Sequence, residues 1–365
     1  MRVPDPRDWR QEFIASATSW TEARLYVAAA YITTWAILDR LQPPPAFSPI
    51  DDGLIPWDGT WYRDLALDGY DSPALEGGIR FFPLWPMLGR VFGAIGDRPD
   101  IALVVLANIL ALVAGMFLYR ITLQETGDPG LAVRTVRLFA LFPPAFVLTL
   151  GYSEALYLSL AMGFVLAARG RRWLVTAVLG FLAGLTRPVA GLLALPAAVC
   201  AWKSDRRSPS ALLAVGSAPL GTLSFLVWSS AEGYGWRAPV DAQQDLRGKF
   251  AEPISRLTSA LYDGVRGEEG ELFHGLAALI LIGLAVYSVR KLSTDLWVYT
   301  VPSTLLLVSA DNLNSMERYS LSVFPLIIAA AMISRSERLD RWLPTASAVA
   351  LTVVTTLALN GVYVP

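Results

Sequence analysis

Residues 100–119 read Asp-Ile-Ala-Leu-Val-Val-Leu-Ala-Asn-Ile-Leu-Ala-Leu-Val-Ala-Gly-Met-Phe-Leu-Tyr, a run of 20 residues with a single charge. A helix of about 20 apolar residues is long enough to cross the ~30 Å hydrocarbon core of a bilayer. The whole chain has 365 residues, 54% of them hydrophobic and 17% charged, and its mean hydropathy is +0.45. Because only helices and closed barrels satisfy the backbone in lipid, and the short alternating strands of a barrel are missing, we predict an all-α polytopic membrane protein.

Ten further apolar runs predict about eleven transmembrane helices in a single domain that covers residues 1–365. The runs lie near residues 22–41, 134–150, 153–168, 172–187, 189–202, 210–229, 272–289, 295–310, 319–333 and 342–360. The runs 189–202 and 295–310 are short, which predicts a broken or tilted helix at each. Residues 5–20 are polar and mixed in charge, and we expect a helix there that lies on the membrane surface.

The distribution of Lys and Arg predicts the orientation. Eighteen of the 30 basic residues fall in the N-terminal segment and in every second short loop, and such loops face the cytoplasm. The pattern predicts a multi-pass plasma-membrane protein with a cytoplasmic N-terminus and an outer C-terminus. Two long loops, about residues 42–99 and 231–271, then lie outside. The first is rich in Trp, Phe and Pro and should hold short interfacial helices, and the second is more polar and resembles a water-facing cover.

Charge and cysteine content exclude several classes of function. The formal net charge of −1 gives no reason to expect a nucleic-acid partner. Cys200 is the only cysteine, so the chain has no internal disulfide and no Cys-x-x-Cys metal site. An Asp-x-Asp motif, a phosphate-binding Gly-rich loop and a Ser–His–Asp set are also missing. The one histidine, His274, is interpreted as a helix-end residue, and we predict no metal site.

The outer loop 42–99 carries the first candidate for chemistry, within the stretch Trp57-Asp58-Gly59-Thr60-Trp61-Tyr62. Crossing a bilayer does not require a carboxylate among aromatic rings at its surface. Asp58 can act as a general base if it reaches the proton that it removes. The alternative is structural, because Asp before Gly and Thr at a helix start is a favoured N-cap.

Three arginines and one glutamate interrupt the charge pattern on the outer side: Arg80, Arg187, Arg318 and Glu154. Ionisable groups near hydrocarbon usually mark a pathway, a pair or a ligand. The guanidinium group presents a fork of donors that matches phosphate oxygens. The alternatives are an arginine that snorkels or pairs with a nearby acid, such as Arg318 with Asp311 or Glu317, and a glutamate that favours a helix N-terminus after Ser153.

The order of these motifs resembles the PIG-V family of mannosyltransferases, which belong to the GT-C class of membrane glycosyltransferases and have bacterial members. The resemblance spans about residues 50–330. It rests on Trp57-Asp58-Gly59, Gly69-Tyr70, Phe81-Phe82-Pro83-Leu84, Phe142-Pro143, Gly151-Tyr152-Ser153-Glu154-Ala155-Leu156, Gly184-Leu185-Thr186-Arg187-Pro188 and Arg318-Tyr319.

The resemblance implies a GT-C fold, a donor and a mechanism. The donor would be polyprenyl-phosphate mannose, the acceptor a glycolipid or cell-envelope glycan, and the reaction inverting on the outer face of the membrane. Asp58 would be the base, with Arg318 the first and Arg187 the second choice to neutralise the leaving phosphate. Trp57, Trp61 and Tyr62 would stack on sugars or line a lipid groove, Tyr152 and Glu154 would orient the sugar or the base, and Arg80 and Tyr319 complete the substrate-binding set. No metal or other cofactor is implied, and the class is often monomeric.

Other functions fit parts of the same pattern. A GT-C enzyme could use another polyprenyl-phosphate sugar on a similar frame. A flippase or transporter of lipid-linked sugars would explain the many helices, but it predicts charges near the bilayer midplane and often inverted repeats. Here the unusual charges cluster at one face and no repeat is visible. A catalytically dead scaffold subunit would not need Asp58 and the outer arginines.

Overall fold

The computed structural model describes residues 9–38, 48–72, 77–204, 208–248, 250–267, 270–313, 315–334 and 337–363. These residues are all-helical, with 80% helix and no strand. The elements in chain order are α1 (Trp9–Thr33), η2 (Thr34–Leu38), η3 (Pro49–Asp52), α3 (Asp58–Asp68), η5 (Gly78–Arg80), α4 (Leu84–Gly93), α5 (Pro99–Thr126), α6 (Pro129–Ala140), η6 (Pro143–Leu148), α7 (Glu154–Arg169), α8 (Trp173–Gly184), η7 (Pro188–Leu193), α9 (Ala194–Ser204), α10 (Pro209–Ala231), α11 (Ala238–Arg247), α12 (Pro253–Val265), α13 (Glu271–Lys291), α14 (Thr294–Val308), α15 (Met316–Ser320), α16 (Pro325–Ile333) and α17 (Glu337–Leu359).

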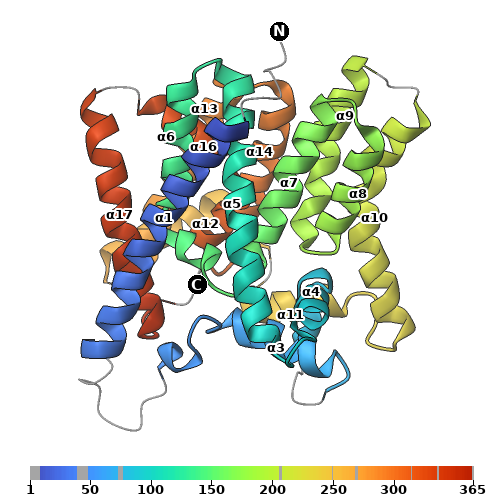
Figure 1. Cartoon of the computed structure of the whole chain (residues 1–365), viewed down its shortest axis with the longest axis horizontal. Helices are drawn as coiled ribbons and strands as arrows, with labels where there is room; N and C mark the ends of the chain where they lie inside the picture. The colour runs from blue at the N-terminus through green and yellow to red at the C-terminus, as the bar shows by residue number, and fades with distance from the viewer. Residues whose placement is uncertain are drawn as a thin grey trace.

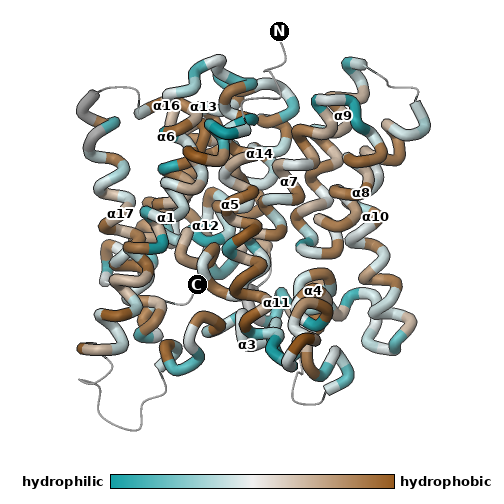
Figure 2. The backbone as a smooth tube through the Cα atoms, viewed as in Figure 1, coloured by the Kyte–Doolittle hydropathy of each residue, from teal (hydrophilic) through white to brown (hydrophobic). Residues whose placement is uncertain are grey.

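Four of the described helices are long and apolar enough to cross a membrane: α5, α10, α13 and the stretch Trp342–Leu359 of α17. Their outer faces stay apolar, as Ile109 on α5 and Leu223 on α10 show, each more than half exposed. Such faces suit contact with lipid. Hydrophilic residues lie mainly toward the two ends of the bundle (Figure 2). The all-helical prediction is confirmed, the four apolar helices are consistent with a membrane protein, and the count of eleven spans stays a prediction.

Two predicted segments are wrong in detail. Residues 9–20 do not form a separate surface helix, because α1 runs unbroken from Trp9 to Thr33. Residues 134–150 are not one helix. α6 ends at Ala140 and the 3-10 helix η6 follows, because Pro143 and Pro144 cannot continue an α-helix. Residues 5–8 of the predicted surface helix, and residues 39–47 and 73–76 of the predicted first span and outer loop, lie outside the described residues.

Two further predicted segments are interrupted next to prolines. Segment 189–202 is broken, as predicted: η7 covers Pro188–Leu193 and α9 begins at Ala194. The prediction of one helix over 319–333 is wrong, because the segment divides into the end of α15 and α16, which begins at Pro325. The segment 295–310 forms α14, with Pro302 inside the helix. The interruptions at η7 and between α15 and α16 lie at the end of the bundle that carries α3, α4 and α11 (Figure 1).

The first long loop is tied to this end by hydrogen bonds to backbone carbonyls. The Trp85 indole donates to the Gly151 carbonyl at 3.0 Å, and the Leu84 amide donates to the Leu185 carbonyl at 3.0 Å. The Tyr70 hydroxyl donates to the Phe81 carbonyl at 2.6 Å. These bonds bring the stretch that contains Asp58 against the turns that precede α7 and η7.

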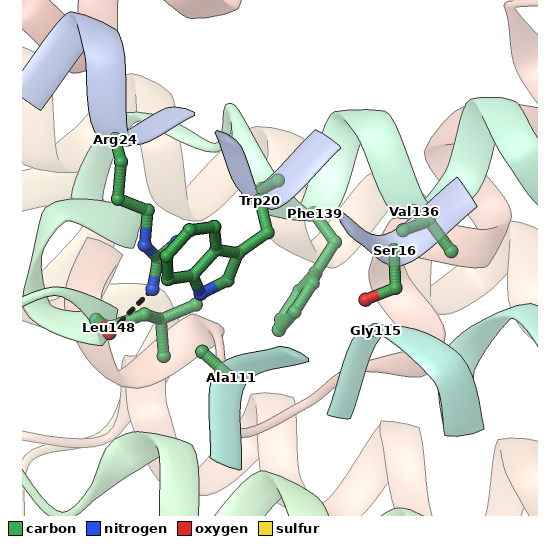
Figure 3. Close-up of a pocket in the computed structure, with 9 residues that line it drawn as sticks. Ser16, Trp20, Arg24, Ala111, Gly115, Val136, Phe139 and Leu148 are labelled. Carbon is green, nitrogen blue, oxygen red and sulfur yellow. Dashed lines mark hydrogen bonds between the residues drawn. The ribbon is translucent and has the colours of Figure 1, made fainter. Parts of the chain in front are cut away.

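A half-buried arginine holds η6 against α1 and α5 (Figure 3). The Arg24 guanidinium donates to Asn108 Oδ1 at 3.0 Å and to the Leu148 carbonyl at 2.8 Å, and it stacks over the Trp20 ring. The Trp20 indole donates to the Asn108 carbonyl at 3.0 Å. The Leu148 carbonyl at the end of η6 thereby gains a hydrogen-bond partner, as a buried backbone group requires. This network fixes the chain just before Gly151-Tyr152-Ser153-Glu154.

Helices α8 and α10 approach each other through two glycines. A Cβ on Gly184 would lie 2.2 Å from the Ala218 carbonyl oxygen, and one on Gly221 would lie 2.1 Å from the Phe181 carbonyl oxygen. Small residues allow such close backbone approach in membrane proteins. The contact fixes the end of α8, from which Thr186 and Arg187 continue.

Replacing Gly221 by alanine is expected to lower the free energy of unfolding by about 1–3 kcal/mol, because the added methyl group forces the two backbones apart. Gly216→Ala, on the same helix, is the matched control, since the nearest atom to its added Cβ lies 3.8 Å away. Thermal unfolding of the detergent-purified variants measures the difference. Equal melting temperatures for both would show that the α8–α10 contact is not tightly packed.

Candidate functional site

Helix α3 begins at Asp58, and the turn before it is strained. Trp57 is the N-cap residue and has φ 57°, a left-handed conformation that is costly for a bulky side chain. Its indole donates to the Ala358 carbonyl on α17 at 3.2 Å, which holds the turn in place. The N-cap interpretation of Asp58 is therefore wrong, because Asp58 is the first helical residue and its side chain is directed to Arg318.

Four charged side chains from four parts of the chain meet beside this turn. Arg318 Nη1 lies 2.6 Å from Asp58 Oδ2, and Arg318 Nε also pairs with Glu154 Oε1. Arg187 Nη2 lies 2.5 Å from the same Glu154 oxygen. The ion pairs of Arg318 are therefore formed with Asp58 and Glu154. They are not formed with Asp311 or Glu317, the two alternative partners that the sequence suggested.

The members of this cluster differ in exposure. The Glu154 side chain is 0% exposed and the Arg318 side chain 1%, whereas the Asp58 side chain is 24% exposed. Buried charges persist only with partners, and here each guanidinium has a carboxylate. Asp58 is the member of the cluster that meets solvent or a ligand most readily.

Tyrosine and serine side chains complete the cluster. Arg318 stacks over the Tyr152 ring at 4.4 Å and over Tyr319 at 5.2 Å. The Ser153 hydroxyl shares a 2.8 Å hydrogen bond with the Tyr62 hydroxyl and accepts one from Arg187 Nε at 3.2 Å. Burial raises the pKa of Tyr62 above that of a free phenol, so Tyr62 stays a neutral hydrogen-bonding group.

The cluster forms one wall of a cavity of about 530 Å³. Apolar side chains line another part of it: Val189, Leu192, Leu226, Leu306, Leu307 and Val323. α11, within the second long loop, contributes Pro239, Val240, Gln243 and Gln244 to the lining. A volume of this size with few polar groups suits a ligand that is largely apolar and polar at one end.

Arg80 lies on the cavity wall and has a different environment from the other two arginines. Its guanidinium lies 4.6 Å from the ring centroids of both Trp61 and Phe81, and Nη1 donates to the Gly77 carbonyl at 3.2 Å. Within the part of the chain that the structure describes, no carboxylate pairs with Arg80. Arg80 is therefore a positively charged group that lines the cavity and is fixed by two aromatic rings and one backbone carbonyl.

The structure brings most of the predicted site residues to one place. Six of them line the cavity: Asp58, Tyr62, Arg80, Arg187, Arg318 and Tyr319. Tyr152 and Glu154 lie behind this wall and contact Arg318. Trp61 supports Arg80 from outside the lining, and Trp57 is directed to α17 instead.

Several residues at the site were missed at the sequence level. Ser153 is the N-cap residue of α7, and Glu154 lies in its first turn as one alternative proposed, but the Ser153 side chain makes no capping bond and instead bonds Tyr62 and Arg187. Ser322 accepts from Arg187 Nη1 at 3.4 Å. Gln243 and Gln244 face the cavity from α11. Only the position of Ser153 inside Gly151-Tyr152-Ser153-Glu154 offered a signal, since isolated Ser and Gln residues are common in loops.

No group of three or more His, Cys, Asp or Glu side chains among the described residues is arranged to hold a metal ion. The prediction that the reaction needs no metal stays a prediction. Comparison with protein-family models found no match, and comparison with curated proteins found none either. The similarity to PIG-V mannosyltransferases therefore rests on the motifs and their order.

Proposed function

We propose that this protein is an inverting glycosyltransferase that transfers a sugar, mannose in the first instance, from a polyprenyl-phosphate donor to a hydroxyl group of a lipid-linked or cell-envelope glycan. The observation that carries the proposal is the position of Asp58, paired with a buried arginine on the wall of a cavity that continues between apolar side chains. A carboxylate, cations and an apolar channel are what a lipid-phosphate sugar requires. The reaction takes place on the outer face of the plasma membrane.

The chemical step uses groups that already meet at the cavity. The acceptor oxygen attacks the anomeric carbon, and the bond from that carbon to the phosphate oxygen breaks. The electron pair leaves with the phosphate, and Asp58 takes the proton of the acceptor hydroxyl as a general base. Attack from the face opposite the leaving group inverts the anomeric carbon.

The charges of the site match those of such a donor. Asp58 and Glu154 offset Arg187 and Arg318, and Arg80 contributes one further positive charge. A sugar–phosphate–polyprenyl diester carries one negative charge. When Asp58 takes up the proton, Arg318 loses one of its two carboxylate partners, and its charge then stabilises the second negative charge that develops on the leaving phosphate.

The sequence-level ranking of the arginines changes accordingly. Arg318 and Arg187, the first and second choices for the phosphate, are already engaged by Glu154. Arg80, the arginine that best fitted a merely snorkelling role, lies against the rings of Trp61 and Phe81 on the cavity wall. We assign ground-state binding of the donor phosphate to Arg80 and transition-state stabilisation to Arg318.

Arg80→Ala is expected to raise the KM for the donor about 10- to 100-fold with a smaller change in kcat, because a charge-assisted hydrogen bond contributes about 1.5–3 kcal/mol. Arg80→Lys keeps the charge but loses the planar stacking, so its donor KM should lie between those of the wild type and Arg80→Ala. Arg63→Ala is the control, since Arg63 pairs with Asp64 on the same loop and does not line the cavity. An unchanged donor KM for Arg80→Ala would remove Arg80 from the donor site.

The experiment that tests the function is transfer by the purified protein from polyprenyl-phosphate [¹⁴C]mannose to lipids extracted from its source membrane. Label in a new product supports the proposal and identifies the acceptor. Consumption of a different polyprenyl-phosphate sugar keeps the reaction class and overturns mannose. If no lipid-phosphate sugar is consumed, the proposal is wrong and transport or scaffolding remains.

A further inference from the structure

Arg318 is carried by an element that is too short to hold its own position. Helix α15 has five residues and follows Ser315, whose φ of 63° marks a left-handed turn. A single helical turn gains few backbone hydrogen bonds for the residues that it orders. The place of α15, and with it that of Arg318, therefore depends on contacts between its side chains and neighbouring helices.

Glu317, the residue before Arg318, makes such a contact. Its Oε1 lies 2.7 Å from Nδ1 of His274 in the first turn of α13. Both residues are only 8% exposed, so the pair is shielded from water. Consecutive residues of α15 are thus bound to different helices: Glu317 to α13, and Arg318 to α3 and α7.

A second pair holds the chain just before α15. Arg256 on α12 lies 2.9 Å from a carboxylate oxygen of Glu271, which opens α13 one turn before His274. The same guanidinium donates through Nε to the Asp311 carbonyl at 2.6 Å. Helices α12 and α13 therefore bind this part of the chain at two points, the Asp311 carbonyl and the Glu317 side chain.

We infer that His274 is a positioning residue for glycosyl transfer, which acts by anchoring Glu317 and so holding Arg318 against Asp58 and the leaving phosphate. This inference rests on the proposed function for its catalytic consequence, but the anchoring itself does not. His274 touches neither the cavity nor Asp58, so its effect on the reaction must pass through α15.

The first test compares His274→Ala with His274→Asn. The alanine variant leaves Glu317 buried without its partner, and a displaced Arg318 is expected to lower kcat about 10- to 100-fold, as small misplacements in active sites do. The asparagine amide can donate from about the position of Nδ1, so this variant should recover most of the rate. Equal rates for wild type and His274→Ala would overturn the inference.

A double-mutant cycle separates positioning from a general loss of stability. If His274 acts through Arg318, His274→Ala should change the residual rate of Arg318→Gln by less than about twofold. A general loss of active protein would lower both backgrounds by the same factor, and that outcome would also overturn the inference.

Hydrogen exchange supplies a readout that does not depend on activity. Amide exchange of residues 315–320 should accelerate in His274→Ala and stay near the wild-type rate in His274→Asn. If the wild type transfers no sugar, the proposed function fails, while this exchange result still tests the anchor. If the wild type is active and exchange in His274→Ala is unchanged, the anchor is wrong and the function stands.

Discussion

Replacing Asp58 by asparagine is expected to reduce sugar transfer about 10²- to 10⁴-fold, because the amide cannot accept the proton of the acceptor hydroxyl. The substitution keeps the size of the side chain, and Arg318 retains Glu154 as a partner. Since the Asp58 side chain is 24% exposed, water screens part of the change in charge, and the variant should insert like the wild type and lose less stability than Glu154→Gln.

Asp68→Asn is the matched control for this experiment. Asp68 lies at the other end of the same helix and is exposed, away from the charge cluster. Transfer rates are measured on both purified variants with the same polyprenyl-phosphate donor, beside thermal unfolding. A normal rate for Asp58→Asn would mean that another group is the base, and an equal loss in Asp68→Asn would point to damage of α3 as a whole.

Replacing Glu154 by glutamine is expected to have the largest effect on stability. Both Arg187 and Arg318 pair with one oxygen of Glu154, whose side chain is 0% exposed. Neutralising it leaves Arg187 without a carboxylate and Arg318 with Asp58 alone. Loss of one member of a buried ion pair typically costs about 3–5 kcal/mol, because the remaining charge stays buried.

A second substitution distinguishes this cause from a packing defect. The double variant Glu154→Gln with Arg187→Met removes a buried charge of each sign and should recover much of the lost stability, since well-packed apolar groups often replace a buried pair at little cost. Glu232→Gln, an exposed acid at the end of α10, should unfold like the wild type. If Arg187→Met gives no recovery, the loss comes from packing around Glu154 rather than from its charge.

The sequence predicts the helical segments correctly where hydrophobicity alone determines them. α5, α10 and α13 match their predicted runs within several residues, since a long apolar run leaves the backbone no partner but itself in lipid. The failures lie where proline and tertiary contacts intervene. The prolines after Phe142 end α6 early, and packing extends α1 back to Trp9 through a stretch whose polarity indicated a surface helix.

The sequence identified the individual residues of the candidate site, but it did not predict which of them form ion pairs. Unusual charges on the predicted outer side singled out Asp58, Glu154, Arg187 and Arg318, because such groups are costly near hydrocarbon. Their partners lie far apart in the chain: Arg318 is 164 residues from Glu154. Local patterns suggested near neighbours instead, so Asp58 was weighed as an N-cap and Arg318 as a partner of Glu317.

Composition and periodicity thus establish that the protein is helical and apolar enough for a membrane, and they identify which ionisable side chains are out of place there. Three-dimensional packing assigns the pairs: it joins Arg318 to Asp58 and Glu154, and Glu317 to His274. It also turns Trp57 toward α17 and places Arg80 on the cavity wall. The physical reason is the separation along the chain of the residues involved. Hydrophobic periodicity is a property of one helix, whereas these ion pairs depend on how helices that are distant in sequence pack together.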